Sequence, residues 1–380
     1  MSFLYCYVVE NVYFCDRMDG MTIHPDEQTL IALLRMAWGG AEQPLPGGEV
    51  DWQSVYELSL RQGVTAVACE GLLRLPSVDE GVRYNWMAQT LLCEMDCERK
   101  IQATRKLSQM WAEQGIHGVV LKGLAFAQHY ANPTHRPFGD LDVFLFDGWE
   151  AGNRVAEDAG VTVRRGYYKH STLSFQGLTV ENHRFCTPIR GGRRRKQYER
   201  YLQQLLRQEP LTPVEGVPLL SPPPLFNLIF FLSHARNHFL NEGGVTLRFV
   251  CDWAALLQAY GPDGDCRQPQ ELWHELLRRC RDYDLSSFAM SMSRLAQQVC
   301  GVAAPFGCGA DDAADRLLLA DMLASNVAPV EFSQGWRTRW QLIRSVLGSR
   351  RKFHYFSRRS MPVSLLESAW AYCTDRHPSL

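Results

Sequence analysis

The spacing of apolar residues changes twice along this chain, and the two changes limit the folds that it can adopt. Apolar residues recur at helical spacing from about residue 24 to 110, most clearly in DEQTLIALLRMAW (26–38). Short β-branched runs alternate like strands between about 115 and 190, and helical spacing returns from Leu225 onward. This order predicts an α+β fold, in which a core of mixed sheet and helices is flanked by N- and C-terminal helical regions.

Capping and turn residues give the expected bounds of the elements. Asp26 and Asp51 are expected to cap helices, and Gly63 to end one. Asp147 is expected to cap a helix that stops at Gly160. The sequence further predicts helices at 81–115 (one or a pair), 124–131, 191–208, 225–239, 247–260 and 271–285, strands at 117–123, 140–146, 161–169, 171–176 and 178–185, and a proline-rich connector at 210–224.

Length, charge and cysteine spacing narrow the class of protein. The 380 residues suffice for two or three domains, and a formal net charge of -1 gives no overall field that would attract nucleic acid or an anionic membrane. No apolar run is long enough for a membrane span. Twelve cysteines without a C-x-x-C pair indicate a reducing compartment, so we expect a cytoplasmic protein. We expect a non-native leader or disordered start at 1–22, a helical region at 23–114, the core at 115–215 and a second helical region at 216–380.

Two carboxylates stand at the head of a strand that is otherwise apolar, in RPFGDLDVFLF (136–146). Asp140 and Asp142 share one face of that strand, because side chains alternate along it. Two carboxylates that close repel one another unless a cation lies between them, and Mg²⁺ prefers such ligands together with substrate phosphates. A solvated strand start is the alternative explanation for this pair.

Four further residues make a phosphate-handling site the better explanation. Lys122 and Gly123 end one strand and open a helix, whose free N–H groups would favour an anion. Arg136 adds a cation four residues before Asp140. Glu181, in LTVENH, supplies a third carboxylate that would bind a metal or orient an attacking hydroxyl.

The segment VVLKGLAFAQHYANPTHRPFGDLDVFL (119–145) resembles the uncharacterised nucleotidyltransferase family of bacteria, within the polymerase-beta-like nucleotidyltransferase superfamily. The resemblance continues through VENH, HARNH and LRFVCDWAALL and covers about residues 28 to 260. It implies that the core at 115–215 has the polymerase-beta-like nucleotidyltransferase fold. In this chain a Lys-Gly replaces the superfamily's usual Gly-Ser, and a Glu replaces the commoner third Asp.

The resemblance also implies roles for individual residues. Asp140, Asp142 and Glu181 would be the catalytic and metal-binding acids, with Mg²⁺ (or Mn²⁺) as cofactor. Lys122, Gly123 and Arg136 would bind the nucleoside triphosphate. The residues that would line a substrate pocket are His183, His234, His238, Arg248 and Asp252.

Two other features have alternative explanations. His234 and His238 lie one helical turn apart, a spacing that can bind zinc, but no third ligand is evident. They could equally face a substrate, or join a polar network in which Arg248 and Asp252 pair. The run RGGRRRKQYER (190–200) could bind RNA or DNA phosphates, although a solvated helix face is the more common reason for such a run.

These observations predict an enzyme that moves a nucleoside monophosphate from a nucleoside triphosphate to an acceptor hydroxyl, with release of pyrophosphate. The acceptor could be a protein, an RNA or a small molecule, and no membrane is involved. The alternatives are a catalytically silent nucleotide-binding or interaction module, and an RNA-binding protein that uses the basic helix.

Overall fold

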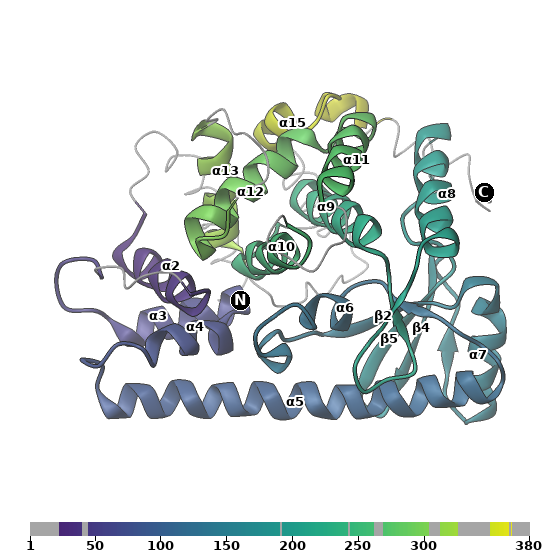
Figure 1. Ribbon diagram of the computed structural model, residues 1–380, viewed down its shortest axis with the longest axis horizontal. Helices are drawn as coiled ribbons and strands as arrows, with labels where there is room; N and C mark the ends of the chain where they lie inside the picture. Colours follow the sequence, from purple (N-terminus) through teal and green to yellow (C-terminus); the bar gives the residue numbers. More distant parts are fainter. Residues whose placement is uncertain are drawn as a thin grey trace, which may run out of the picture. The chain divides into compact units, whose positions relative to one another are not determined.

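A seven-stranded mixed sheet carries most of the predicted β-containing segment. The computed structural model describes residues 23–39, 45–190, 192–241, 244–261, 269–303, 312–325, 350–364 and 366 (Figure 1). The strand order is β3-β4-β5-β2-β1-β7-β6. β2 pairs with β5 and β1 with β7 in parallel, and the other neighbours are antiparallel. The strands are β1 (Val119–Val120), β2 (Asp140–Phe144), β3 (Val163–Arg164), β4 (His170–Phe175), β5 (Leu178–His183), β6 (Thr212–Pro213) and β7 (Leu220–Ser221).

Helices precede and follow the strands along the sequence, so the predicted α+β class is confirmed. The 81–115 segment is one helix rather than a pair, because no residue within it breaks the helical hydrogen bonding. The helices are α2 (Pro25–Ala37), α3 (Trp52–Gln62), α4 (Thr65–Leu72), α5 (Glu80–Glu113), α6 (Leu124–Ala127), α7 (Trp149–Asp158), α8 (Arg193–Gln208), α9 (Pro224–Asn241), α10 (Leu247–Tyr260), α11 (Pro269–Asp282), α12 (Ser286–Cys300), α13 (Asp312–Ala324) and α15 (Arg350–Phe356), with short 3-10 turns η1 (Pro133–His135) and η2 (Phe146–Gly148).

Contacts divide the chain into two units that alternate along the sequence. The first contains Met1–Met87, Ala235–Ala254 and Asp284–Met361, and the second contains Ala88–His234, Ala255–Tyr283 and Pro362–Leu380. The sheet lies in the second unit. The domain boundaries expected from the sequence stay a prediction, and the expected leader at 1–22 lies outside the described residues.

A two-residue turn fixes the register of β4 against β5. Gln176 and Gly177 both have positive φ, 49° and 77°, as a type I′ hairpin turn requires. Phe175 therefore pairs with Leu178, and the ladder runs back to a pair between His170 and His183. This register decides which side chains share a face with Glu181.

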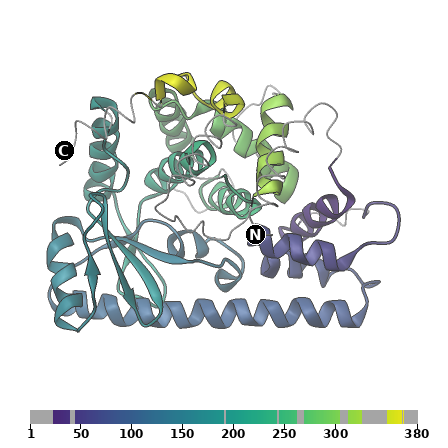
Figure 2. The same ribbon diagram turned by 180° about the vertical axis from the view of Figure 1, so that it is seen from behind.

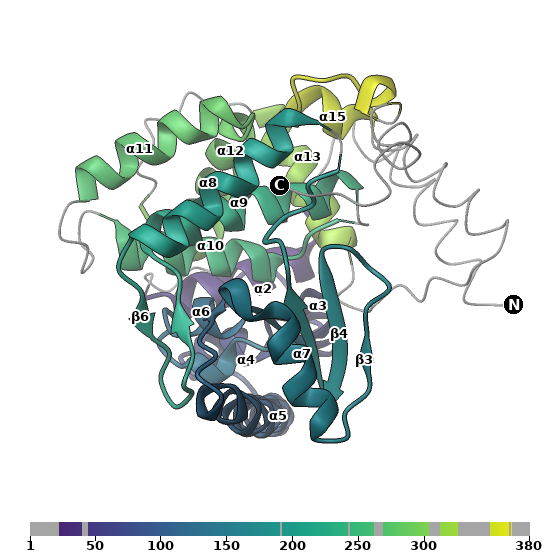
Figure 3. The same cartoon turned by 90° about the vertical axis from the view of Figure 1, so that its right-hand side faces the viewer.

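Helices α5 and α7 cover the face of the sheet opposite the acidic residues. Asn182, whose neighbours in β5 point the other way, donates from its amide to the Trp149 carbonyl and to Asn153 of α7. The Trp111 indole of α5 donates to the Gly152 carbonyl of α7 at 3.1 Å. Figure 3 shows α7 beside β3 and β4, and Figure 2 shows the sheet from behind with the second half of α5 along it.

Buried polar contacts join the helices of the first unit. The Gln62 side chain, at the end of α3, donates to the carbonyls of Met322 and Ser325 and accepts from the Leu247 amide. One fully buried side chain thus ties α3 to the end of α13 and the start of α10.

Several local predictions are wrong. His24 caps α2, not Asp26: its Nδ1 accepts from the Asp26 amide and Glu27 completes a capping box. Asp147 does not cap α7, which has Gly148 as its N-cap; it pairs instead with Arg207 at 2.9 Å. The helix predicted at 124–131 is only four residues long, and the proline-rich connector contributes β6 and β7 to the sheet. Asp51 and Gly63 cap α3 as predicted.

No helix within the described ranges is long and apolar enough to cross a membrane.

A buried histidine in the second unit predicts a pH-dependent loss of stability. His129 packs edge-on against Tyr260, whose hydroxyl lies 2.9 Å from its Nε2, and burial lowers the pKa of His129 from 6.5 to about 4. Below pH 6.5 the unfolded chain therefore binds a proton at His129 that the folded chain does not bind. The free energy of unfolding should fall by up to about 3 kcal/mol as the pH is lowered from 6.5 to 4. In urea unfolding across this pH range, His129→Gln should flatten the loss. An equally steep loss in the variant would show that His129 is not its source.

Candidate metal and phosphate site

Strands β2 and β5 bring the three predicted acids together. The two strands lie side by side (Figure 1). Their parallel register sets Asp142 directly beside Glu181, and Asp140 beside Thr179. Ligand oxygens of Asp140, Asp142 and Glu181 all lie within 4.8 Å of one another. The convergence follows from pairing and alternation, since residues in register on neighbouring strands point to the same face.

The three carboxylates differ in exposure. The Asp142 side chain is 3% exposed, whereas those of Glu181 and Asp140 are 24% and 36% exposed. The cluster therefore has a buried floor and an open side at Asp140. An open side is what a bound ion needs if it is also to contact a substrate.

The ammonium of Lys122 lies between the aspartates. Its Nζ is 3.0 Å from Asp142 Oδ2 and 3.4 Å from Asp140 Oδ2. Burial disfavours the charge on Lys122, but the attraction of Asp142 and then Asp140 outweighs it, and the pKa of Lys122 is raised. A cation of the chain itself thus relieves the repulsion between the aspartates, whereas the sequence suggested a divalent metal ion for this role.

The two aspartates respond to their surroundings in opposite directions. Burial and repulsion from Asp142 outweigh the attraction of Lys122, so the pKa of Asp140 is raised. Burial would also raise the pKa of Asp142, but Lys122 and the hydrogen bond to His183 outweigh it, so that pKa is lowered. Asp142 is therefore the residue that is held ionised at the floor of the cluster.

Two histidines hold Glu181. His170 Nδ1 lies 2.9 Å and His183 Nε2 3.3 Å from Glu181 Oε2, and His183 Nε2 also lies 3.0 Å from Asp142 Oδ1. Although burial opposes it, these close contacts with the two imidazoles keep the pKa of Glu181 below its usual range. A carboxylate held ionised in this way suits a cation ligand and is a poor proton acceptor.

Sequence reasoning missed His170. It lies outside the motif that carries the resemblance, and a lone histidine before a strand carries no signal of its own. The Gln176–Gly177 turn was the available signal, because a two-residue hairpin centred there sets His170 opposite His183.

The donor set fits a hard divalent cation. Asp142 Oδ2 is buried and has no hydrogen-bond partner among the described residues other than the ammonium of Lys122. Three carboxylates on one face, with one side open, match the oxygen ligands that Mg²⁺ and Mn²⁺ prefer. Asp140, Asp142 and Glu181 could therefore hold such an ion.

A family comparison decides the class of the chain. The model of the uncharacterised nucleotidyltransferase family matches residues 48–301, more than half of the chain. The chain belongs to this family. The matched range includes all three acids and parts of both units. No curated protein and no solved structure gives a significant match.

Gly123 and Arg136 lie together beside the backbone of Asp140. Gly123 has a φ of 66°, and a Cβ placed on it would lie 3.7 Å from the Asp140 carbonyl and 3.9 Å from Arg136 Nη1. Arg136 is 6% exposed and donates to the Pro137 carbonyl. The helix that follows Gly123 has only four residues, so its dipole contributes little to an anion site.

The predicted substrate-pocket residues are distributed over both units. His183 belongs to the acidic cluster, and His234 of α9 stacks on Phe230 in the same unit. His238, Arg248 and Asp252 lie in the other unit, where the rings of His238 and Phe249 pack and Arg248 lies over Phe249. Neither His234 nor His238 belongs to a metal-binding group among the described residues.

The basic helix α8 uses some of its side chains for packing within the second unit. Arg193, Arg194 and Arg195 are exposed, but the Tyr198 hydroxyl donates to Ser233, and Arg279 lies over the Tyr201 ring. The buried Glu199 accepts from the amides of Cys186 and Thr187, which fixes α8 to the segment after β5. Neither tyrosine is left as a platform for base stacking.

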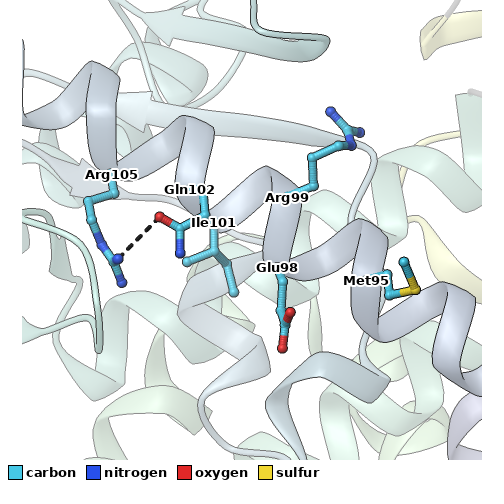
Figure 4. Close-up of a pocket in the computed structure, with 6 residues that line it drawn as sticks. All are labelled: Met95, Glu98, Arg99, Ile101, Gln102 and Arg105. Carbon is cyan, nitrogen blue, oxygen red and sulfur yellow. Dashed lines mark hydrogen bonds between the residues drawn. The ribbon is translucent and has the colours of Figure 1, made fainter.

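A pocket on α5 lies apart from the acids. Figure 4 shows it along this single helix, with Arg105 donating to Gln102. No predicted site residue lines it; its lining residues are Met95, Glu98, Arg99, Ile101, Gln102 and Arg105.

Proposed function

We propose that this chain transfers a nucleoside monophosphate from a nucleoside triphosphate to an acceptor hydroxyl and releases pyrophosphate. The acceptor oxygen bonds to the α-phosphorus, the bond from that phosphorus to the bridging oxygen of the β-phosphate breaks, and the hydroxyl proton passes to water or a carboxylate. The observation that carries the proposal is the convergence of Asp140, Asp142 and Glu181 in a chain of a nucleotidyltransferase family.

Each residue has a part in this proposal. Asp140, Asp142 and Glu181 hold Mg²⁺ or Mn²⁺, which when bound neutralises phosphate charge and favours an ionised hydroxyl. Asp142 fixes the floor of the site and Asp140 meets the substrate at the open side. His183 and His170 keep Glu181 ionised and oriented.

Lys122 has two positions in this proposal. Without nucleotide its ammonium holds the aspartates, as the distances of 3.0 and 3.4 Å indicate. With the aspartates serving as metal ligands, the ammonium would be available to pair with the triphosphate, together with Arg136 and the backbone of Gly123. A flexible lysine chain permits such a move without a change of the strand.

The proposal is tested by label transfer. The full chain is incubated with each of the four nucleoside triphosphates, labelled at the α-phosphate, with Mg²⁺ or Mn²⁺ and with fractions of a cell extract. We expect at least one triphosphate to label a protein, RNA or small-molecule product in a metal-dependent way. No labelled product from any triphosphate, with either metal, would contradict the proposal.

One argument against the alternative of a catalytically silent module does not hold. A site without function would have no reason to hold two like charges together, but Lys122 gives the pair of Asp140 and Asp142 a structural role as its ion-pair partners. The nucleotidyltransferase proposal therefore depends on Glu181 joining the pair, and on the open side at Asp140.

A further inference from the structure

A second group of possible metal ligands adjoins the three carboxylates. Ligand atoms of His170, Glu181 and His183 all lie within 4.8 Å of one another. We propose that they bind a divalent first-row transition-metal ion, of the kind represented by Zn²⁺ and Co²⁺, beside the all-carboxylate site. The inference rests on the proposed function in one respect only, because Glu181 would be a ligand in both sites.

The distances match metal coordination. His170 Nδ1 and His183 Nε2 lie 2.9 and 3.3 Å from Glu181 Oε2. Ligand atoms around a tetrahedral ion with bonds of about 2.0 Å are about 3.3 Å apart. The imidazole rings approach from neighbouring strands with centroids 5.2 Å apart, so both can reach one ion without a change in the backbone.

His183 is already oriented as a metal ligand. Its Nδ1 donates to the Phe185 carbonyl at 3.0 Å, because a carbonyl oxygen can only accept. Histidines that bind metals usually make such a bond with their second nitrogen, which fixes the ring and directs the other nitrogen to the ion. The directed atom here is Nε2, which faces Glu181 and Asp142. The His183 side chain is 2% exposed.

The unsatisfied Nδ1 of His170 is a separate observation that supports a bound ion. Its Nδ1 is buried and has no hydrogen-bond partner among the described residues, although Glu181 Oε2 lies 2.9 Å away. A short approach without hydrogen-bond geometry leaves that nitrogen unsatisfied. An ion between the two atoms would satisfy both.

The ligand types separate this site from its neighbour. Imidazole nitrogen suits Zn²⁺, Co²⁺ and similar ions, whereas Mg²⁺ prefers oxygen alone. Two adjacent sites of different ligand type can therefore be filled by different ions. Glu181 would bridge them, as carboxylates do in two-metal centres.

Cobalt titration of the full chain tests the inference. We expect one Co²⁺ per chain with visible absorption bands, displaced by Zn²⁺ but not by Mg²⁺. His170→Gln should weaken Co²⁺ binding at least tenfold, while the exposed His274→Gln should leave it unchanged. Asp140→Asn should retain Co²⁺ binding, because Asp140 belongs only to the carboxylate site.

A ligand-exchange variant gives a second, spectroscopic signal. His170→Cys should add a thiolate-to-cobalt charge-transfer band in the near ultraviolet, relative to the unchanged chain. Absence of that band, or Co²⁺ affinity equal in the unchanged chain and His170→Gln, would overturn the site. Co²⁺ binding that needs His170 in a chain that transfers no nucleotide would support the site and count against the proposed function alone.

Discussion

Asp142→Asn is expected to lower nucleotidyl transfer at least about a thousandfold, equivalent to about 4 kcal/mol in the activation free energy. The amide keeps the shape of the side chain but removes the charge at the floor of the site, where a metal ligand and a partner of Lys122 are both required. The label-transfer assay with purified variant and saturating Mg²⁺ measures the loss.

Two matched variants separate chemistry from folding. Asp142 is buried against Lys122 and His183, so its replacement also removes the nearest anionic partner of both and should cost about 3 kcal/mol of stability. Asp140→Asn, at the more exposed position, should cost less stability and still lose transfer. Asp147→Asn, a few residues on and 89% exposed, should keep full transfer. Full transfer by Asp140→Asn and Asp142→Asn would refute the site.

Gly71→Ala is expected to cause the largest loss of stability of any single methyl group added to the first unit. A Cβ at Gly71 of α4 would lie 2.0 Å from the backbone carbonyl oxygen of Leu33 in α2. Backbone atoms cannot rotate away as a side chain can, so the two helices must separate. Overpacking of this kind costs about 3 kcal/mol or more.

Thermal and urea unfolding measure the effect of the added methyl group. Gly47→Ala is the matched control, since a Cβ there meets nothing within 4 Å and should change stability little. Equal unfolding midpoints for Gly71→Ala and the unchanged chain would show that α2 and α4 do not approach as closely as the structure has them.

The acidic core of the site was predictable because its geometry follows from strand rules. Alternation set Asp140 and Asp142 on one face, and the alternation in LTVENH set Glu181 and His183 together. The change from helical to strand spacing and back identified the sheet between its helical regions. These features depend on periodicity, which can be read directly from the sequence.

Other features depend on contacts between distant segments. The ammonium of Lys122 lies on the aspartates because β1 and β2 are antiparallel neighbours, which residue spacing does not reveal. The same holds for β6 and β7, whose prolines suggested only a connector. His24 replaced Asp26 as a cap because Pro25 already occupies the first helical position, a local signal that could have been used.

The position of the label tests the central claim most directly. One triphosphate is prepared in two forms, labelled at the α- or at the γ-phosphate, and each is incubated with the full chain, metal ion and the acceptor fraction. We predict that the α-label appears in the acceptor and the γ-label in pyrophosphate, in equal amounts. Transfer of the γ-label to the acceptor, or release of either label only as free nucleotide and phosphate, would contradict nucleotidyl transfer.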